Sequence, residues 1–324
     1  MGSQLSVAKA LNNALRKSLE SDPKTLLMGE DIGKLGGVFR ITDGLQKDFG
    51  EDRVIDSPLA ESGIMGTAIG LALRGYRPVV EIQFDGFVYP AFDQIVSQLA
   101  KMHARALGHV KMPVTVRIPY GGGIGAVEHH SESHEAYFIH TAGLRVVSPS
   151  NPHDAHWMLR QAIASDDPVI FLEPKRRYWD KGEVGDEAGI GLHTAKVVRE
   201  GADATLIAYG PMVKVCQEAA AAAEEDGRRL EVVDLRSLSP VDFATVEASV
   251  KRTGRAVVVH EAPVFLGLGA ELAARITEKC FYHLEAPVLR VGGYHAPYPP
   301  SRVEETFLPD LDRVLDAVDR ALAY

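Results

Sequence analysis

The sequence predicts an α/β protein made of two doubly wound domains. Short apolar runs of strand length alternate with periodic segments of helix length along most of the chain, which is typical of a mostly parallel sheet covered on both faces. This alternation is interrupted once, between residues 174 and 193, where charged residues and four glycines occur without apolar periodicity. The length of 324 residues also favours two domains over one.

The first half begins with an amphipathic segment at residues 6–21, which Asp22-Pro23 should end as a helix. Further helices are expected at residues 60–73, 90–106 and 154–164. Strands are expected at residues 25–28, 78–84, 112–118, 145–148 and 169–172.

The second half repeats the alternation without a convincing internal repeat. Strands are expected at residues 205–209, 230–235, 256–260 and 288–291, and helices at residues 212–225, 242–252, 268–278 and 311–322. We therefore expect a first domain at residues 1–180, a linker at 181–193 and a second domain at 194–324.

The composition fits a globular protein and excludes two kinds of partner. A hydrophobic fraction of 46% suffices for buried cores, and a net charge of −9 is unfavourable for binding nucleic acid. No stretch reaches the roughly 18 apolar residues of a membrane helix, and the N-terminus lacks the apolar block of a signal peptide. Cys216 and Cys280 lie in apolar helical contexts typical of buried, reduced thiols, without metal-ligand spacing. We expect a cytoplasmic protein and no metal site in this chain.

Ligands of doubly wound domains bind at the carboxyl ends of the strands. This rule directs attention to Glu30, to residues 83–87 and to residues 119–130.

Glu61 opens the helix expected at residues 60–73, which is otherwise apolar and small. A carboxylate in the first turn can simply complement the helix dipole, so a functional role stays open here. Gly63, Gly66 and Gly70 share one face of this helix. Glycine weakens a helix by roughly 1 kcal/mol relative to alanine, so this face should have a packing reason.

The glycine-rich run that begins at Tyr120 carries His129 and His130. It lacks the helix and the lysine of a phosphate-binding loop, so it fits a permissive active-site loop better. Paired histidines in loops are often inert, although a histidine can exchange protons near neutral pH.

Gln83 and Phe87 lie around the end of the strand expected at residues 78–84. The aromatic ring is either a core residue or a flat surface for a heteroaromatic ligand. Nucleophile-elbow, Walker and dinucleotide-binding motifs are absent.

Eight motifs, in order along the chain, resemble the β subunits of the E1 components of 2-oxo acid dehydrogenases. The motifs are Leu27-Met-Gly-Glu-Asp-Ile-Gly33, Gly36-Gly-Val-Phe-Arg-Ile-Thr42, Ser57-Pro-Leu-Ala-Glu-Ser-Gly63, Glu81-Ile-Gln-Phe84, Pro90-Ala-Phe-Asp-Gln-Ile95, His130-Ser-Glu-Ser133, Asp167-Pro-Val-Ile-Phe-Leu-Glu-Pro-Lys175 and Glu231-Val-Val-Asp-Leu-Arg236. The resemblance implies a transketolase-like pyrimidine-binding domain followed by a transketolase C-terminal-like domain.

The resemblance also implies roles for single residues toward thiamine diphosphate. Glu61 falls on the glutamate that bonds N1′ of the aminopyrimidine, and Phe87 on an aromatic residue beside that ring. Gln83 lies on the same cofactor-side segment, and Glu30 resembles an acid near Glu61 in a proton path between sites. His130 falls on a loop histidine that handles the acyl group and its transfer to lipoyl, although His129 is a competing position.

A Gly-Asp-Gly motif followed by Asn-Asn, which holds Mg²⁺ and diphosphate in thiamine enzymes, is not found. The resemblance therefore implies an α subunit that supplies this half of the site, in an α2β2 tetramer. It further implies docking to the lipoyl-bearing E2, with Glu285 matching an acid of the docking patch, and a possible structural K⁺.

The expected reaction is oxidative decarboxylation of a 2-oxo acid with reductive acylation of lipoyl-E2. Branched-chain substrates are slightly favoured over pyruvate, because Gly-Gly-Val-Phe and Ile-Gln-Phe recur in the branched-chain group. A non-catalytic scaffold or E2-docking subunit is the alternative of another class. A single-chain transketolase-like enzyme is disfavoured, since no room remains for a diphosphate domain.

Overall fold

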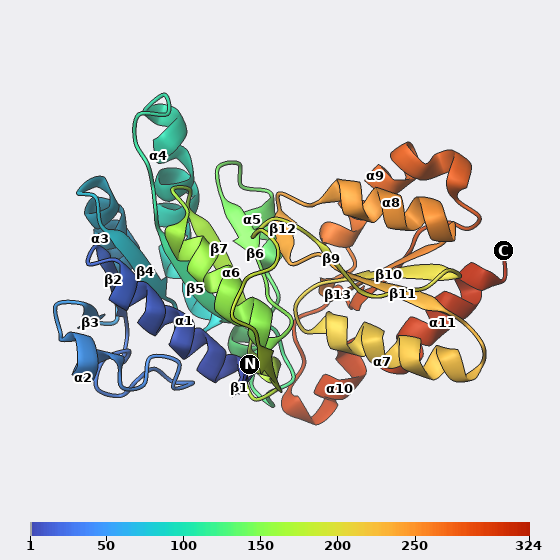
Figure 1. Ribbon diagram of the computed structural model, residues 1–324, viewed down its shortest axis with the longest axis horizontal. Coiled ribbons are helices and arrows are strands. Elements are labelled where there is room, and N and C mark those ends of the chain that lie inside the picture. The colour runs from blue at the N-terminus through green and yellow to red at the C-terminus, as the bar shows by residue number, and fades with distance from the viewer. Residues whose placement is uncertain (1) are drawn as a thin grey trace. The chain divides into compact units, whose positions relative to one another are not determined.

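A computed structural model describes residues 2–324, which form two compact units (Figure 1). The first unit extends to Tyr120 and continues through Tyr137–Leu192, and the second holds Gly121–Ala136 and His193–Tyr324. The second unit thus includes the glycine-rich loop from the first half of the sequence. The division expected from sequence, 1–180 and 194–324 with a linker at 181–193, counts this loop in the first domain.

The first unit is built on a parallel sheet. Its strands are β2 (Thr25–Gly29), β3 (Val54–Asp56), β4 (Arg77–Glu81), β5 (Thr115–Tyr120), β6 (Arg145–Val147) and β7 (Val169–Pro174). They lie in the order β6-β7-β5-β4-β2-β3, and all neighbouring pairs are parallel. The central strands are buried along their length, and their sequences are mostly apolar.

Helices α1 (Val7–Ser21) and α6 (Pro152–Ala164) pack against each other over this sheet (Figure 1). The Ser6 hydroxyl caps α1 by accepting a hydrogen bond from the Lys9 N–H. Buried residues of both helices share one core with the strands. The remaining helices of this half are α2 (Leu45–Phe49), α3 (Glu61–Leu73), α4 (Ala100–Arg105) and α5 (Glu135–Ile139).

Two segments of the first unit differ from expectation. The single helix expected at residues 90–106 is a succession of a 3₁₀ helix (Asp85–Ala91), a π-helix (Gln94–Leu99) and α4. The segment expected to be a linker contains β8 (Lys181–Val184), which pairs antiparallel with β1 (Ser3–Ser6). The pairing of β8 with β1 is a tertiary contact that local periodicity does not report.

The second unit has a five-stranded sheet in the order β14-β13-β10-β11-β9, parallel except for the edge strand β9. Its strands are β9 (Lys196–Arg199), β10 (Ala204–Ala208), β11 (Leu230–Asp234), β13 (Ala256–Pro263) and β14 (Leu289–Gly293). The short β12 (Ser237–Ser239) follows β11 in the chain and is not a strand of this sheet. Helices α7 (Met212–Glu225) and α11 (Leu311–Leu322) cover one face, and α8 (Phe243–Thr253) and α9 (Leu268–Cys280) the other (Figure 1). The four-residue α10 (Glu304–Phe307) precedes α11.

A buried ion-pair network joins three neighbouring strands of the first sheet. Arg117 on β5 donates to Glu173 on β7 at 2.6 and 3.0 Å and to Glu81 on β4 at 2.6 Å. The Tyr178 hydroxyl donates to Glu173 at 2.7 Å. Burial raises the pKa of Glu81, and the nearby Arg117 opposes this rise. One cation therefore balances two carboxylates that would otherwise be buried without compensation.

Replacing this cation should destabilise the protein strongly. Arg117→Met leaves the buried Glu81 and Glu173 without a cationic partner, so the free energy of unfolding should fall by about 3–5 kcal/mol. The control Arg16→Met breaks the exposed pair with Asp48, which should cost less than about 1 kcal/mol. Urea denaturation followed by circular dichroism measures both, and equal losses would contradict the assigned role of the network.

Glu135, at the start of α5, is a second buried acid. The Tyr209 hydroxyl donates to its Oε1, while Oε2 has no hydrogen-bond partner among residues 2–324. Burial raises the pKa of Glu135 from 4.5 to about 7, and the bond from Tyr209 acts in the opposite direction.

This raised pKa predicts a stability that depends on pH. The folded chain keeps the Glu135 proton up to about pH 7, whereas the unfolded chain releases it near 4.5. The contribution is therefore fully present below pH 4.5 and is lost as pH rises to 7, by about 3 kcal/mol. Glu135→Gln cannot lose a proton, so its melting temperature relative to the parent should increase steadily between pH 5 and 8. A difference independent of pH, measured by differential scanning fluorimetry, would refute this assignment.

Candidate functional site

The structure places two predicted acids, Glu30 and Glu61, at the carboxyl end of the first sheet. Glu30 follows β2 directly, and Glu61 is the first residue of α3. Each side chain is only 7% exposed. Burial raises the pKa of Glu30, and the charge of Glu61 raises it further, while the Ala60 N–H bonds the Glu30 carboxylate and opposes the rise. The two carboxylates are thus electrostatic neighbours.

Neither acid has its full set of partners. Glu30 Oε1 is buried without a hydrogen bond among residues 2–324, and the Glu61 carboxylate forms no hydrogen bond or ion pair to that part of the chain. Buried polar atoms are normally satisfied, so the buried Glu30 Oε1 indicates a group that residues 2–324 do not supply. A ligand that donates or shares a proton suits this pair of acids.

Gln83 links the turn that follows β4 to the segment that follows β2. It was expected within a strand, but β4 ends at Glu81 and Gln83 lies in the turn that follows. Its side-chain amide donates to the Glu30 carbonyl at 3.4 Å and to Asp31 Oδ2 at 3.1 Å. Gln83 therefore fixes the backbone of Glu30.

Phe87 lies in the 3₁₀ helix after β4 and is half-buried. Its ring meets the Phe84 ring edge-on at 5.9 Å between centroids, and the Phe84 ring meets Phe39 at 5.4 Å. Lys175 lies 5.7 Å from the Phe84 centroid and forms an ion pair with Asp85, both side chains being fully buried. The half-buried Phe87 ring therefore packs on Phe84, and the Phe84 ring in turn lies beside the buried Lys175–Asp85 ion pair.

His129 and His130 lie in a 3₁₀ turn (Glu128–His130) of the glycine-rich loop. His130 is half-buried, and its Nδ1 is 2.9 Å from the His129 carbonyl oxygen. His129 is 51% exposed, and its Nδ1 lies 3.7 Å from Glu128 Oε1. The loop belongs to the second unit, whereas the four cofactor-side residues belong to the first.

Sequence reasoning missed two further residues that contact this loop. Glu261 on β13 and Glu304 on α10 accept hydrogen bonds from loop amides, although they lie more than a hundred positions away in the sequence. The one sequence signal for Glu261 was a glutamate inside the apolar run of β13. A charge in a buried strand normally has a partner, so this position indicated a specific contact.

The small face of α3 has no packing partner in its own unit. Gly63, Gly66 and Gly70 are exposed, and a Cβ added at Gly66 or Gly70 would meet no atom within 4 Å. Between Glu61 and Arg74 the helix carries no charged residue. These features fit a surface that packs against another chain.

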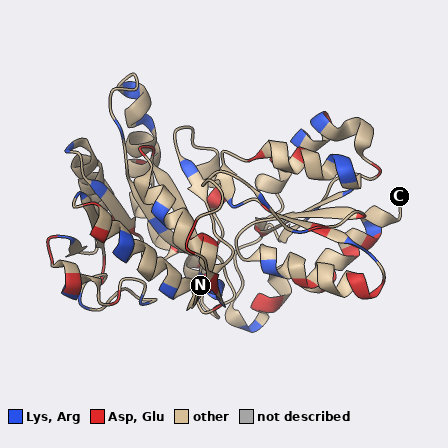
Figure 2. Ribbon diagram, viewed as in Figure 1, with Lys and Arg blue, Asp and Glu red and all other residues tan. Residues whose placement is uncertain are grey.

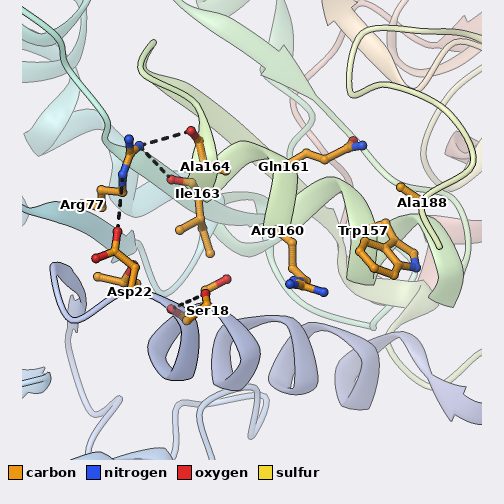
Figure 3. A pocket seen from close by; sticks show the side chains of 11 residues that line it. Ser18, Asp22, Arg77, Trp157, Arg160, Gln161, Ile163, Ala164 and Ala188 are labelled. Atoms are coloured by element: carbon orange, nitrogen blue, oxygen red, sulfur yellow. Dashed lines mark hydrogen bonds and ion pairs between the residues drawn. The ribbon is translucent and has the colours of Figure 1, made fainter. Parts of the chain in front are cut away.

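A surface cavity of about 370 Å³ is lined by residues of α1 and α6 (Figure 3). Arg77 donates there to the carbonyls of Ile163, Ala164 and Ser165, and Arg160 lies 4.8 Å from the Trp157 ring. Arg77 is therefore occupied by the protein itself. Neither glutamate nor histidine of the predicted site lines this cavity.

Among residues 2–324 no group of three or more His, Cys, Asp or Glu side chains could hold a metal ion. Within the same residues, no helix has the length and apolar character to cross a membrane. In the ribbon of the described residues, Lys and Arg are interspersed with Asp and Glu (Figure 2).

Comparison with known families matches both units. Residues 3–180 match the transketolase pyrimidine-binding domain, and residues 193–314 match the transketolase C-terminal domain. A solved structure titled "Split gene transketolase, inactive beta4 tetramer" superposes with a TM-score of 0.80 over 98% of each chain, at 24% identity. These matches confirm the predicted fold class.

Three curated relatives agree on the family. The chain is 62% identical to the pyruvate dehydrogenase E1 component subunit beta of Leifsonia xyli, covering 99% of this chain and 95% of that protein. It is 57% identical to the 3-methyl-2-oxobutanoate dehydrogenase subunit beta of Mycobacterium tuberculosis (98% and 92% covered) and 46% identical to the 2-oxoisovalerate dehydrogenase subunit beta of Pseudomonas aeruginosa (98% and 95% covered). The resemblance inferred from the eight motifs is confirmed. The chain belongs to the family of E1 β subunits of 2-oxo acid dehydrogenase complexes, which are oxidoreductase components with a transketolase-like fold.

Proposed function

We propose that the chain is the β half of a thiamine-diphosphate-dependent E1 enzyme, which oxidatively decarboxylates a 2-oxo acid and acylates lipoyl-E2. The observation that carries this proposal is the pair of buried, incompletely partnered carboxylates Glu30 and Glu61 at the ligand-binding edge of a pyrimidine-binding domain. The relatives named above support the reaction class.

The residues present fit the aminopyrimidine end of the cofactor. Glu61 would accept or share a proton at N1′, and its burial excludes the water that would otherwise compete for that proton. Phe87 would offer a flat face to the ring, and Gln83 would keep Glu30 in place beside Glu61. When bound, thiamine diphosphate supplies the nucleophilic carbon and the electron sink for decarboxylation.

We assign Mg²⁺ and the diphosphate to an α subunit, in an α2β2 tetramer. The sequence has no Gly-Asp-Gly motif followed by Asn-Asn, and the exposed small face of α3 offers a surface for the second chain. A structural K⁺ and a cytoplasmic location remain predictions of the sequence, and so does the boundary of the linker at residues 181–193.

The substrate is proposed as a class, a 2-oxo acid that is either pyruvate or branched-chain. Relatives named for pyruvate and for branched-chain substrates occur at 62% and 57% identity. The sequence motifs slightly favour branched-chain substrates, whereas the named relatives support pyruvate equally.

The lipoyl-bearing E2 is the proposed second partner, docked near Glu285. This carboxylate is 59% exposed and forms an ion pair with Arg255 at 2.6 Å. Phe281 and Tyr282, close to it in sequence, are 63% and 96% exposed. An acid with adjoining exposed aromatic rings suits a partner that presents basic and apolar groups.

The split site predicts activity only in the complex. With thiamine diphosphate and Mg²⁺, α and β together should decarboxylate a 2-oxo acid in a dye-linked assay, and the purified β chain should not. Glu61→Gln in the complex should lower kcat by about 10²–10⁴-fold, because proton transfer at N1′ is impaired. The exposed Glu51→Gln is the matched control.

Activity of β alone would overturn the split site, and full activity of the Glu61 variant would overturn that residue's role. An active complex is also the result that excludes a scaffold function. Rates with pyruvate and with branched-chain acids in the same assay identify the substrate.

The two histidines can be separated by a matched pair of variants. His130→Ala should lower the lipoyl-linked rate more than the dye-linked rate, by about 10²-fold in their ratio, because only the former needs transfer of the acyl group. His129→Ala, at the more exposed neighbouring position, should leave the ratio unchanged. The reverse pattern would assign the role to His129.

A further inference from the structure

The glycine-rich loop is held by carboxylates that are distant in the sequence. We propose that Glu261 and Glu304 are positioning residues that hold the loop Gly121–Ala136 and thereby fix His130. This inference rests on the role proposed above for His130, and it gives the C-terminal half of the chain a part in the reaction beyond docking.

Glu261 holds the beginning of the loop. It lies on β13, and its side chain is 3% exposed. The Gly122 N–H donates to its Oε1, and the Ser133 hydroxyl donates to the same oxygen at 3.4 Å. One buried carboxylate therefore links two points of the loop that are eleven residues apart.

Glu304 binds the next turn of the loop with both of its carboxylate oxygens. Its Oε1 accepts a hydrogen bond from the Gly123 N–H at 2.8 Å, and its Oε2 accepts one from the Gly125 N–H at 3.0 Å. The Tyr298 hydroxyl donates to Oε1 at 2.6 Å and orients the carboxylate. Hydrogen bonds to an ionised acceptor are stronger than neutral ones, and a two-oxygen fork also fixes direction.

The glycines are needed for this close approach. A Cβ at Gly122 would lie 1.7 Å from the Tyr298 hydroxyl oxygen. Gly121 has φ +81°, and a Cβ there would lie 2.8 Å from Glu261 Oε1. Gly121 and Gly122 are thus explained by the close approach of Glu261 and Tyr298, and no phosphate is required.

The far end of the loop has an anchor of its own, the hydrogen bond from Tyr209 to Glu135. Between the two anchors, residues 126–130 are exposed or half-buried. Holding both ends removes most of the freedom of the arc that carries His130, which preorganises the side chain before a substrate arrives.

The anchoring can be tested without activity, by hydrogen exchange on the assembled complex. In Glu304→Ala, peptides covering residues 121–125 should exchange at least about tenfold faster, because their amides lose a buried acceptor. Glu305→Ala, the exposed neighbour, is the matched control and should leave exchange unchanged. Glu304→Gln keeps the size of the side chain and serves if the alanine variant does not assemble. Unchanged exchange at residues 121–125 would overturn the anchoring.

A double-mutant cycle tests whether the anchor acts through His130. The measured quantity is the ratio of lipoyl-linked to dye-linked rate in the parent, E304A, H130A and E304A/H130A complexes. We expect E304A to lower the ratio about tenfold in the parent and to have no further effect beside H130A. Equal effects in both backgrounds would overturn the positioning role. An unchanged ratio in H130A alone would instead overturn the function proposed for His130, while the exchange data would still decide on the anchoring.

Discussion

The first unit depends on the ionic connection of Arg117 with Glu81 and Glu173. These residues sit on three neighbouring parallel strands, so the pairs fix the strands relative to one another at the core of the sheet. This fixed arrangement of the strands also sets the positions of the carboxyl ends of β2, β4 and β5. Glu30, the turn with Gln83, and the start of the glycine-rich loop all leave the sheet there. The candidate site is therefore positioned by charge pairing in the core as much as by apolar packing.

Buried acids serve two different purposes in this chain. Glu81 and Glu173 share one guanidinium, and Glu304 is satisfied by amides and a hydroxyl, so these acids hold structure together. Glu30 and Glu61 are buried to a similar degree, yet part of their hydrogen-bonding capacity is unused. Burying a carboxylate is unfavourable without partners, and this contrast is what distinguishes the site from the scaffold.

Much of the fold could be predicted because its central strands and long helices each show their own apolar pattern in the sequence. Helices α7 and α11 have the predicted bounds, since their apolar periodicity ends where they end. Strands β8 and β9 were missed because edge pairing leaves no apolar pattern. The strand-end rule pointed to Glu30, but the roles of Glu61 and His130 came from the resemblance alone. Glu261 and Glu304 could not be predicted, because a contact across more than a hundred residues has no period.

The exposed glycines of α3 have opposite consequences for the stability of the single chain and for the proposed tetramer. Alanine at Gly66 would meet no atom of this chain and would strengthen the helix by about 1 kcal/mol. In the proposed tetramer the same methyl group would occupy space reserved for the second chain. These glycines thus weaken α3 in the single chain, and their open face would be used only in the proposed assembly.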